Sequence, residues 1–275
     1  MSTPSPAVAG LRPVAPVHPP APYVGGKRAL SRQLCELIAA TPHRLYAEPF
    51  VGMGGVFLRR RHRPKVELIN DAAADVANLF RIVQRHPEAL EREIAWALPS
   101  RAGWDRRQLE HPAALTDVER AGRFLYLQRL AFGGKVVGRS FGVHKDTKPS
   151  FSPARLQPVL RALHARLADV VIEQLPYADF IARYDRPGAL FYCDPPYAGT
   201  EGYYGPGLFG PADHARLAEQ LRAIKGRFIV SINDTPEIRA LYEGWSNVQG
   251  VSLLYGVAAS RPTEARELII CGGVR

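Results

Sequence analysis

The spacing of hydrophobic residues changes along the first third of the chain. Residues 30–40 carry leucines and an isoleucine at helical spacing, which predicts an amphipathic helix. Short apolar runs typical of strands follow, separated by a glycine-rich turn and a short helical pattern. The predicted elements are strands at 44–47 and 65–69 and helices at 56–61 and 76–85. This order is typical of the nucleotide-binding half of a doubly wound sheet.

The middle of the chain, residues 87–158, shows little strand periodicity. It contains tryptophans, scattered arginines and a glycine-rich stretch, so we expect a mostly helical insertion. The alternation then returns, with strands expected at 170–173, 189–193, 228–232 and 268–271 and helices at 213–223 and 237–242. One sheet is therefore built from both ends of the chain, and the predicted fold class is α/β and Rossmann-like.

The same patterns divide the chain into an arm, a split domain and an insertion. Residues 1–21 are rich in proline and alanine and lack the basic start and continuous apolar block of a secretory signal, so we expect a disordered arm. The α/β domain is expected to comprise residues 22–86 and 165–275, and the insertion residues 87–164.

Composition narrows the class of protein. No apolar run approaches the ~20 residues that a membrane helix needs, so we expect a soluble chain without a membrane partner. Cys35, Cys193 and Cys271 lie far apart without zinc or disulfide spacing, which indicates a reducing cytoplasm and no metal. The 36 Lys and Arg against 26 Asp and Glu give a net charge of +10. Nucleic acid is the leading partner for such a balance, although a solvated basic surface is an equal alternative.

Asp194, Pro195, Pro196 and Tyr197 directly follow the expected strand at 189–193 and form the strongest chemical signal. Ligands of open α/β sheets bind beyond the carboxyl ends of strands, so these residues are expected to line the binding crevice. The two prolines fix φ and remove backbone donors, which leaves a rigid, acceptor-rich turn. Such a turn suits the amine of a nucleic-acid base. Asp194 and the Pro195 carbonyl would accept hydrogen bonds from its N–H groups, while Tyr197 stacks on the ring of the base. A tight turn without chemistry is the alternative.

A glycine turn at Gly52, Gly54 and Gly55 carries the second signal. Glycine permits positive φ and a close approach of a ligand to the backbone. Asp71 lies 19 residues after Gly52, near the spacing of about 20 at which an acid reaches ribose hydroxyls in dinucleotide folds. Because Glu48 and Asp71 add negative charge, the turn suits a nucleoside carrying a cationic sulfonium better than a diphosphate. A simple turn is an equally common reading of such a pattern.

A third motif runs from Pro22 through Tyr23 to Lys27, before the first expected helix. Its glycines and lysine hint at a phosphate loop. The full phosphate-loop pattern requires Ser or Thr after the lysine, and Arg28 stands there instead. We therefore reject a nucleoside triphosphatase.

In this order the motifs resemble the Dam-type (class alpha) family of DNA adenine methylases, which includes prophage members. The likeness extends from Pro22 to about Gly273, with further matches at 231–242 and 267–270. By this resemblance the catalytic turn comprises Asp194, Pro195, Pro196 and Tyr197. The residues implied to hold the cofactor are Tyr23, Lys27, Glu48, Phe50, Gly52, Gly54, Asp71 and Asp194.

The resemblance implies direct in-line transfer of a methyl group from S-adenosyl-L-methionine to N6 of an adenine flipped out of double-stranded DNA. Base extrusion agrees with the chemistry, because a stacked amine cannot reach a buried sulfonium methyl group. The insertion would recognise the target. Its family-typical stretch ending in Val-Pro-x-Gly is replaced at 140–145, so the target sequence cannot be carried over. The implied DNA contacts are Arg129, Lys135, Arg139, Lys145 and Lys148.

Other function classes stay open at this point. A cytosine-N4 DNA methyltransferase uses a related turn, although such a turn more often begins with Ser. A catalytically inactive DNA-binding scaffold of the same fold is a non-enzymatic alternative, against which the intact Asp194, Tyr197, Lys27 and Asp71 argue. We expect a cytoplasmic monomer. The sequence does not indicate whether a restriction endonuclease accompanies it.

Overall fold

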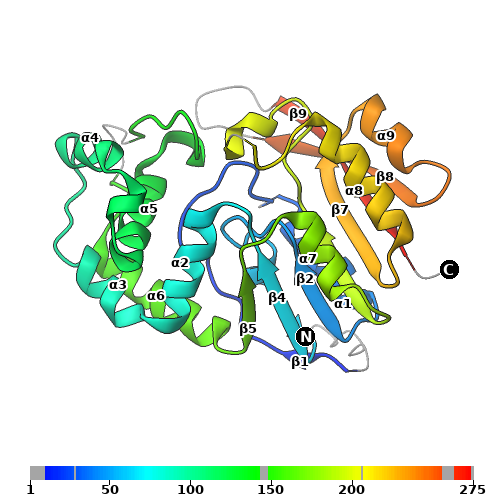
Figure 1. Cartoon of the computed structure of the whole chain (residues 1–275), viewed down its shortest axis with the longest axis horizontal. Helices are drawn as coiled ribbons and strands as arrows, with labels where there is room; N and C mark the ends of the chain where they lie inside the picture. Colours follow the sequence, from blue (N-terminus) through cyan, green and yellow to red (C-terminus); the bar gives the residue numbers. More distant parts are fainter. Residues whose placement is uncertain (1–9, 28, 143–147, 206, 256–262, 274–275) are drawn as a thin grey trace.

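The computed structural model describes residues 10–273 apart from 28, 143–147, 206 and 256–262. Seven strands form one sheet in the order β5, β4, β2, β6, β7, β9, β8 (Figure 1). The first five run parallel, and β9 is antiparallel to both of its neighbours. Their bounds, in the same order, are Val170–Glu173, Val66–Asn70, Leu45–Glu48, Ala189–Cys193, Arg227–Asn233, Thr263–Gly272 and Asn247–Tyr255.

The side on which successive strands are added to the sheet changes at β2. From β2 the chain builds outward to β4 and β5, whereas β6 returns to the other side of β2 and is followed by β7. The carboxyl ends of β2 and β6 therefore lie side by side at a topological switch point, where open α/β sheets bind ligands. The glycine turn follows β2 and Asp194 follows β6, so the fold brings two of the predicted motifs together.

Helices cover both faces of the sheet. Along β6, Ala189, Phe191 and Cys193 pack on one side and Leu190 and Tyr192 on the other, because successive side chains of a strand point to opposite faces. The first side is covered by α7, α8 and α9, and the second by α1, α2 and the insertion (Figure 1). The bounds of these helices are Ser31–Ala40 for α1, Ala74–Arg85 for α2, Tyr177–Tyr184 for α7, Pro211–Ala223 for α8 and Pro236–Tyr242 for α9.

The insertion is mostly helical, as predicted, and most of it lies to the left of the sheet in Figure 1. Its helix α5 begins with a capping box, in which Thr116 accepts from the amide of Glu119 and Glu119 accepts from the amide of Thr116. The expected domain boundary at residue 164 falls within α6, so the division into domains stays a prediction. The insertion helices are α3 (Pro87–Ile94), α4 (Arg101–Leu109), α5 (Asp117–Leu130) and α6 (Pro153–Leu167), with short 3-10 turns η2 (Pro112–Ala114) and η3 (Phe132–Gly134).

The prediction of a disordered arm is wrong for residues 10–21. Strand β1 (Arg12–Pro13) pairs with β3 (His62–Arg63), and the amide of Val17 donates to the carbonyl of Leu58 at 2.8 Å. The backbone hydrogen bonds of this proline-rich segment are thus made with the body of the protein. Residues 1–9 lie outside the described residues.

Three further elements differ from the sequence patterns. Strand β8 and helix α7 are not predicted, although the buried residues of α7, Tyr177, Phe180 and Ile181, lie at helical spacing. The short helix expected at 56–61 is the 3-10 turn η1 (Phe57–Arg59). A last 3-10 turn, η4 (Glu201–Tyr204), follows the Asp194 turn.

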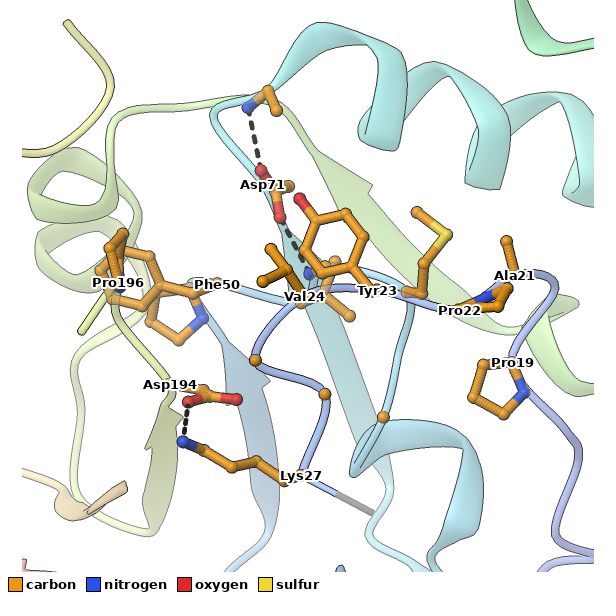
Figure 2. Close-up of a pocket in the computed structure, with 18 of the residues that line it drawn as sticks. Pro19, Ala21, Pro22, Tyr23, Val24, Lys27, Phe50, Asp71, Asp194 and Pro196 are labelled. Atoms are coloured by element: carbon orange, nitrogen blue, oxygen red, sulfur yellow. Dashed lines mark hydrogen bonds and ion pairs between the residues drawn. The ribbon is translucent and has the colours of Figure 1, made fainter. Parts of the chain in front are cut away.

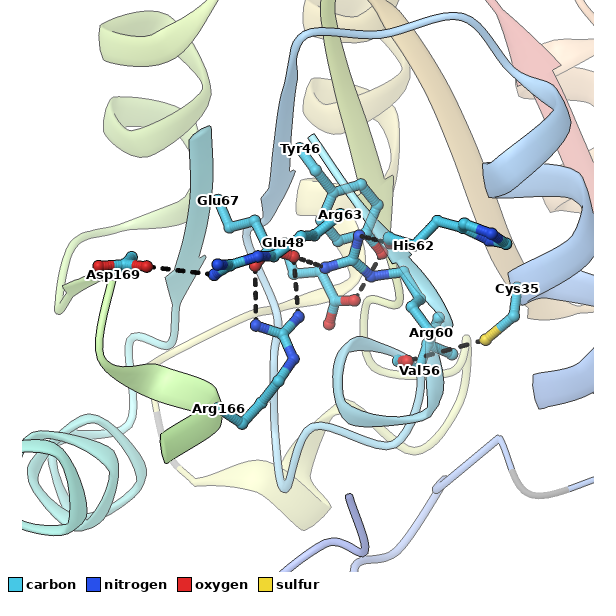
Figure 3. Close-up of polar contacts among 10 residues, drawn as sticks. All are labelled: Cys35, Tyr46, Glu48, Val56, Arg60, His62, Arg63, Glu67, Arg166 and Asp169. Carbon is cyan, nitrogen blue, oxygen red and sulfur yellow. Dashed lines mark hydrogen bonds and ion pairs between the residues drawn. The ribbon is translucent and has the colours of Figure 1, made fainter. Parts of the chain in front are cut away.

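A buried ion cluster ties the insertion to the sheet (Figure 3). Glu67 of β4 accepts two hydrogen bonds from Arg166 of α6, at 2.7 and 2.8 Å, and a third from Arg60. The three side chains are no more than 3% exposed. The guanidinium of Arg60 also stacks 3.7 Å above the ring of Tyr46. These contacts fix the end of α6 against β4, whose other end reaches Asp71.

The described part of the chain contains neither a membrane-spanning helix nor a cluster suited to a metal ion. No helix there is long and apolar enough to cross a bilayer. The described residues also contain no group of three or more His, Cys, Asp or Glu side chains placed to hold a metal.

Candidate active site

A cavity of about 780 Å³ lies at the carboxyl ends of β2, β4 and β6 (Figure 2). Its walls come from the segment around Tyr23 and Lys27, the glycine turn at 49–55, Asp71 and its neighbours, and Asp194 with Pro196. Its volume is in the range of ligand pockets, about 300 to 1,000 Å³. The cavity therefore occupies the switch point that the strand order marks.

Asp71 fixes the glycine turn. Its two carboxylate oxygens accept hydrogen bonds from the backbone amides of Gly52 and Ala73, both at 2.9 Å. Gly52 has a φ of +50°, and a Cβ there would lie 2.9 Å from the Tyr23 ring, so glycine is required for this packing. Burial raises the pKa of Asp71 to about 6, against the lowering effect of the two amides. Since a carboxylate offers about four acceptor sites, Asp71 keeps capacity for a ligand.

Lys27 joins the catalytic turn suggested by the sequence to strand β9. Its side chain is 1% exposed, and its Nζ donates to the Tyr197 hydroxyl at 2.7 Å. The same ammonium lies 3.0 Å from Asp194 Oδ1 and 3.1 Å from Glu267 Oε2. Tyr197 in turn donates to Glu267 Oε1 at 2.6 Å. Four residues from distant parts of the chain thus form one polar cluster.

Asp194 is the acidic member of this cluster that lines the cavity. Its side chain is 20% exposed, and it lines the cavity while Lys27 holds it from behind (Figure 2). Burial raises the pKa of Asp194 to about 6, although the ammonium of Lys27 lowers it. At neutral pH the carboxyl is therefore ionised and presents a hydrogen-bond acceptor to a ligand. Asn233 braces Ala198, the residue that follows Tyr197, accepting from its amide at 2.9 Å and donating to its carbonyl at 3.1 Å.

Three aromatic rings form another part of the wall. Phe50 lies 5.3 Å from Tyr177 and 5.7 Å from Phe209, and Tyr177 and Phe209 are 5.5 Å apart, measured between ring centroids. All three line the cavity beside Pro196. Such a wall offers apolar surface to a planar ring. Tyr177 was not among the predicted site residues, yet it follows the end of β5 just as Asp71 follows β4, so the same strand-end rule points to it.

The sequence profile of the family described as D12 class N6 adenine-specific DNA methyltransferase matches residues 23–255. The chain belongs to this family. It is 27% identical over 264 residues to the retron Ec67 DNA adenine methylase of Escherichia coli, across 92% of this chain and 90% of that protein. The DNA adenine methylase of Serratia marcescens is 32% identical over 242 residues, across 80% and 85%, and that of Haemophilus influenzae 26% over 291 residues, across 96% and 97%. The chain is thus an adenine-specific DNA methyltransferase.

Most of the cofactor residues implied by the resemblance line the cavity of this methyltransferase. Asp194 and Pro196 of the turn at 194–197, here called the DPPY turn, line it as well. Gly54, Pro195 and Tyr197 are not among the lining residues. Gly54 serves packing, because a Cβ there would lie 2.8 Å from a methyl carbon of Leu58. The lining residues among those predicted are Tyr23, Lys27, Phe50, Gly52, Asp71, Asp194 and Pro196.

Glu48, unlike Asp71 and Asp194, does not line the cavity. It lies beneath the glycine turn, 1% exposed and away from the cavity wall, and accepts a hydrogen bond from Tyr46 at 2.6 Å. Burial raises the pKa of Glu48 to about 8, so its carboxyl is mostly protonated at neutral pH. The negative charge that we expected from Glu48 is therefore absent there, and Asp71 and Asp194 supply the acid groups of the cavity.

The predicted DNA contacts of the methyltransferase occupy different surroundings. Arg129 lines the cavity, whereas Lys135 and Lys148 are exposed. Arg139 donates to Gln128 Oε1 at 3.3 Å, and Lys145 lies outside the described residues. Gln128 is buried and donates to the carbonyls of Pro22 and Gly134, at 2.9 and 2.6 Å. The insertion therefore braces the segment that carries Tyr23, a role that the sequence does not reveal.

Proposed function

We propose that this adenine-specific DNA methyltransferase binds S-adenosyl-L-methionine in the cavity and transfers its methyl group directly to N6 of an adenine flipped out of double-stranded DNA. The observation that carries the proposal is Asp194, an ionised carboxylate that faces the cavity at the switch point. It is held from behind by the buried ammonium of Lys27.

The residues of the cavity fit this cofactor. The free acceptor sites of Asp71 suit the hydroxyls of a ribose, and the absence of a Cβ at Gly52 leaves the turn open to close approach. Above pH 6 both Asp71 and Asp194 are ionised, which favours a ligand that carries a sulfonium cation. The aromatic wall around Phe50 offers a surface for the purine ring. When bound, the cofactor would supply an electrophilic methyl group; as N6 takes this group, the neutral thioether S-adenosyl-L-homocysteine would be left and one N6 proton would be released to solvent.

Asp194 and the carbonyl of Pro195 would act on the target amine. The lone pair of N6 is delocalised into the purine ring, which makes the nitrogen a poor nucleophile. Hydrogen bonds from its two N–H groups to the Asp194 carboxylate and the Pro195 carbonyl would draw the nitrogen toward a pyramidal, more reactive form. Tyr197, anchored through its hydroxyl, is the proposed stacking surface for the extruded base, an interaction of roughly 1 to 3 kcal/mol.

The insertion would hold the duplex. Lys135 and Lys148 are exposed, and Lys135 lies 6.0 Å from the ring of Tyr203 in the turn that follows the DPPY residues. Lysines at such positions suit phosphate contacts, which position DNA without reading its sequence. Methyl transfer should therefore weaken steeply with rising salt.

Asp194→Ala tests the proposed role of the carboxylate. Methyl transfer from labelled S-adenosyl-L-methionine to unmethylated duplex should fall by at least about 100-fold, because the N6 acceptor is lost. The matched control is Asp169→Ala, which removes an exposed carboxylate and should transfer at the wild-type rate. An Asp194→Ala protein that is folded by circular dichroism and still methylates DNA would refute the assignment.

Cofactor binding separates an enzyme from an inactive scaffold. At one hundred times its dissociation constant, S-adenosyl-L-methionine should stabilise the folded protein by roughly 2.7 kcal/mol, visible as a thermal shift. A protein that binds DNA but shows no shift with the cofactor would be a scaffold of this fold.

A further inference from the structure

Glu267 of strand β9 belongs to no motif with an assigned role, yet its carboxylate contacts two residues of the candidate site. Oε1 accepts from the Tyr197 hydroxyl at 2.6 Å, and Oε2 lies 3.1 Å from Lys27 Nζ. Its side chain is 1% exposed. Resting on the proposed function, we propose that Glu267 is a positioning residue for methyl transfer: it holds Lys27 and Tyr197 so that Asp194 and the DPPY turn keep their orientation.

The sheet register places a second brace directly beside Glu267. Asn233 of β7 and Glu267 of β9 are opposite partners in the antiparallel ladder. Asn233 binds both backbone polar groups of Ala198, while Glu267 binds the hydroxyl of Tyr197, the residue before it. Neighbouring residues on two strands therefore bind two consecutive residues, Tyr197 through its side chain and Ala198 through its backbone.

Lys27 links Glu267 to Asp194, because its ammonium lies between the two carboxylates. The Lys27 ammonium donates a hydrogen bond to Tyr197 and lies within 3.1 Å of two carboxylates, those of Asp194 and Glu267. The lysine stem is flexible, so the position of Nζ depends on these partners. Without the Glu267 carboxylate, the ammonium loses one of the two negative charges that attract it and is no longer held in a single place beside Asp194.

The charge of Glu267 acts on Asp194 as well. The groups around Asp194 that bear on its charge are Lys27, Glu267, Ser231, Glu48, Tyr192, Cys193 and Tyr197. Within this set, Lys27 lowers the pKa of Asp194 and Glu267 raises it. Neutralising Glu267 should therefore lower the pKa of Asp194. A residue with only a packing role would not change it in this direction.

Glu267→Gln is the primary test, because the amide has the same shape and one acceptor oxygen. We expect kcat for methyl transfer to fall about 10- to 100-fold, as misplacement of a reacting group does, while KM for cofactor and DNA changes little. The acid limb of the kcat profile should move to lower pH. Glu243→Gln, which removes a surface carboxylate of the neighbouring helix end, is the matched control and should show neither change.

Glu267→Asp separates position from charge and also serves if Glu267→Gln does not fold. The shorter side chain keeps the negative charge but loses reach, so kcat should fall while the acid limb stays near its wild-type pH. The proposal is overturned if folded Glu267→Gln has the kcat and acid limb of the wild type, or if both substitutions lower activity only in proportion to unfolded protein. If instead the wild type transfers no methyl group, or Asp194→Ala is fully active, the proposed function itself has failed.

Discussion

Two buried ion clusters of this methyltransferase are built in opposite ways. Near the start of β4, two guanidinium groups, from Arg60 and Arg166, surround the single carboxylate of Glu67. Beyond the end of β6, the single ammonium of Lys27 lies between two carboxylates, those of Asp194 and Glu267. The first cluster is closed, with every member at most 3% exposed, whereas Asp194 in the second is 20% exposed toward the cavity.

The difference shows that buried charge by itself does not indicate a functional site. In the cluster around Glu67, both guanidinium groups pair with the one carboxylate and no member lines the cavity, which suits a joint between α6 and the sheet. In the cluster around Lys27, one carboxylate keeps acceptor sites for a ligand, and burial raises its pKa toward the working pH. A cluster that leaves one group facing a cavity is therefore the one to assign to chemistry.

The largest effect on stability is expected at the closed cluster. Glu67→Gln leaves two buried guanidinium groups without their counter-charge and should lower the free energy of unfolding by about 3 to 5 kcal/mol, measured by urea denaturation. Glu36→Gln removes an exposed ion pair with Arg32 and should cost no more than about 1 kcal/mol. Equal losses in the two variants would contradict the structural role of Glu67.

The open cluster should instead reveal itself in the pH dependence of activity. Burial raises the pKa of Asp194 and of Asp71 to about 6, so kcat/KM should fall as pH drops below 6 and both carboxyls become protonated. Because both folded pKa values exceed the unfolded value of 3.8, the folded state binds more protons between these pH values, and the two groups reduce stability as pH rises from 3.8 to 6. A kcat/KM that is constant from pH 5 to 8 would contradict this prediction.

A smaller effect is expected where the insertion braces the cavity. Gln128→Ala removes the hydrogen bonds to Pro22 and Gly134 and should raise KM for S-adenosyl-L-methionine about tenfold, because Tyr23 is held less firmly. Gln84 is the matched control, since its amide also donates to two carbonyls, those of Leu167 and Val170, away from the cavity. If Gln84→Ala changes KM equally, the effect is general destabilisation.

The smallest effect is expected at Glu48, which is buried and acidic but does not line the cavity. Because burial raises its pKa to about 8, its carboxyl is already mostly neutral at pH 7, and an amide can still accept from Tyr46. Glu48→Gln should leave methyl transfer and unfolding at pH 7 nearly unchanged. A large loss of activity would show that a charge at Glu48 is used after all.

Motifs that are local in the sequence could be predicted, and contacts between distant segments could not. The strand before Asp194 and the glycine turn that contains Gly52 follow from apolar runs and turn residues, and the switch-point rule then brings them together. The positions of the strands along the chain also follow the predicted alternation of elements, apart from β1, β3 and β8, which are not predicted. The fold class and the existence of the cavity were thus accessible from the sequence.

The contacts of Lys27 and Glu267 depend instead on packing. Lys27 appears in the sequence as a residue of a glycine-rich loop, and only the sheet register brings Glu267 opposite Asn233 and beside Tyr197. The neutral state of Glu48 likewise follows from desolvation, which the residue type does not reveal. Helix α7 is also not predicted, and its first residue, Tyr177, joins the aromatic wall only through packing against Phe50 and Phe209.

Transfer of an isotopically labelled methyl group tests the central claim most directly. The purified protein is incubated with S-adenosyl-L-methionine carrying a trideuterated methyl group and with unmethylated genomic DNA, which is then digested to nucleosides for mass spectrometry. We predict N6-methyladenine that carries the deuterated methyl group, and none with the Asp194→Ala protein. Label in N4-methylcytosine, or no labelled base from a protein that binds the cofactor, would contradict the account.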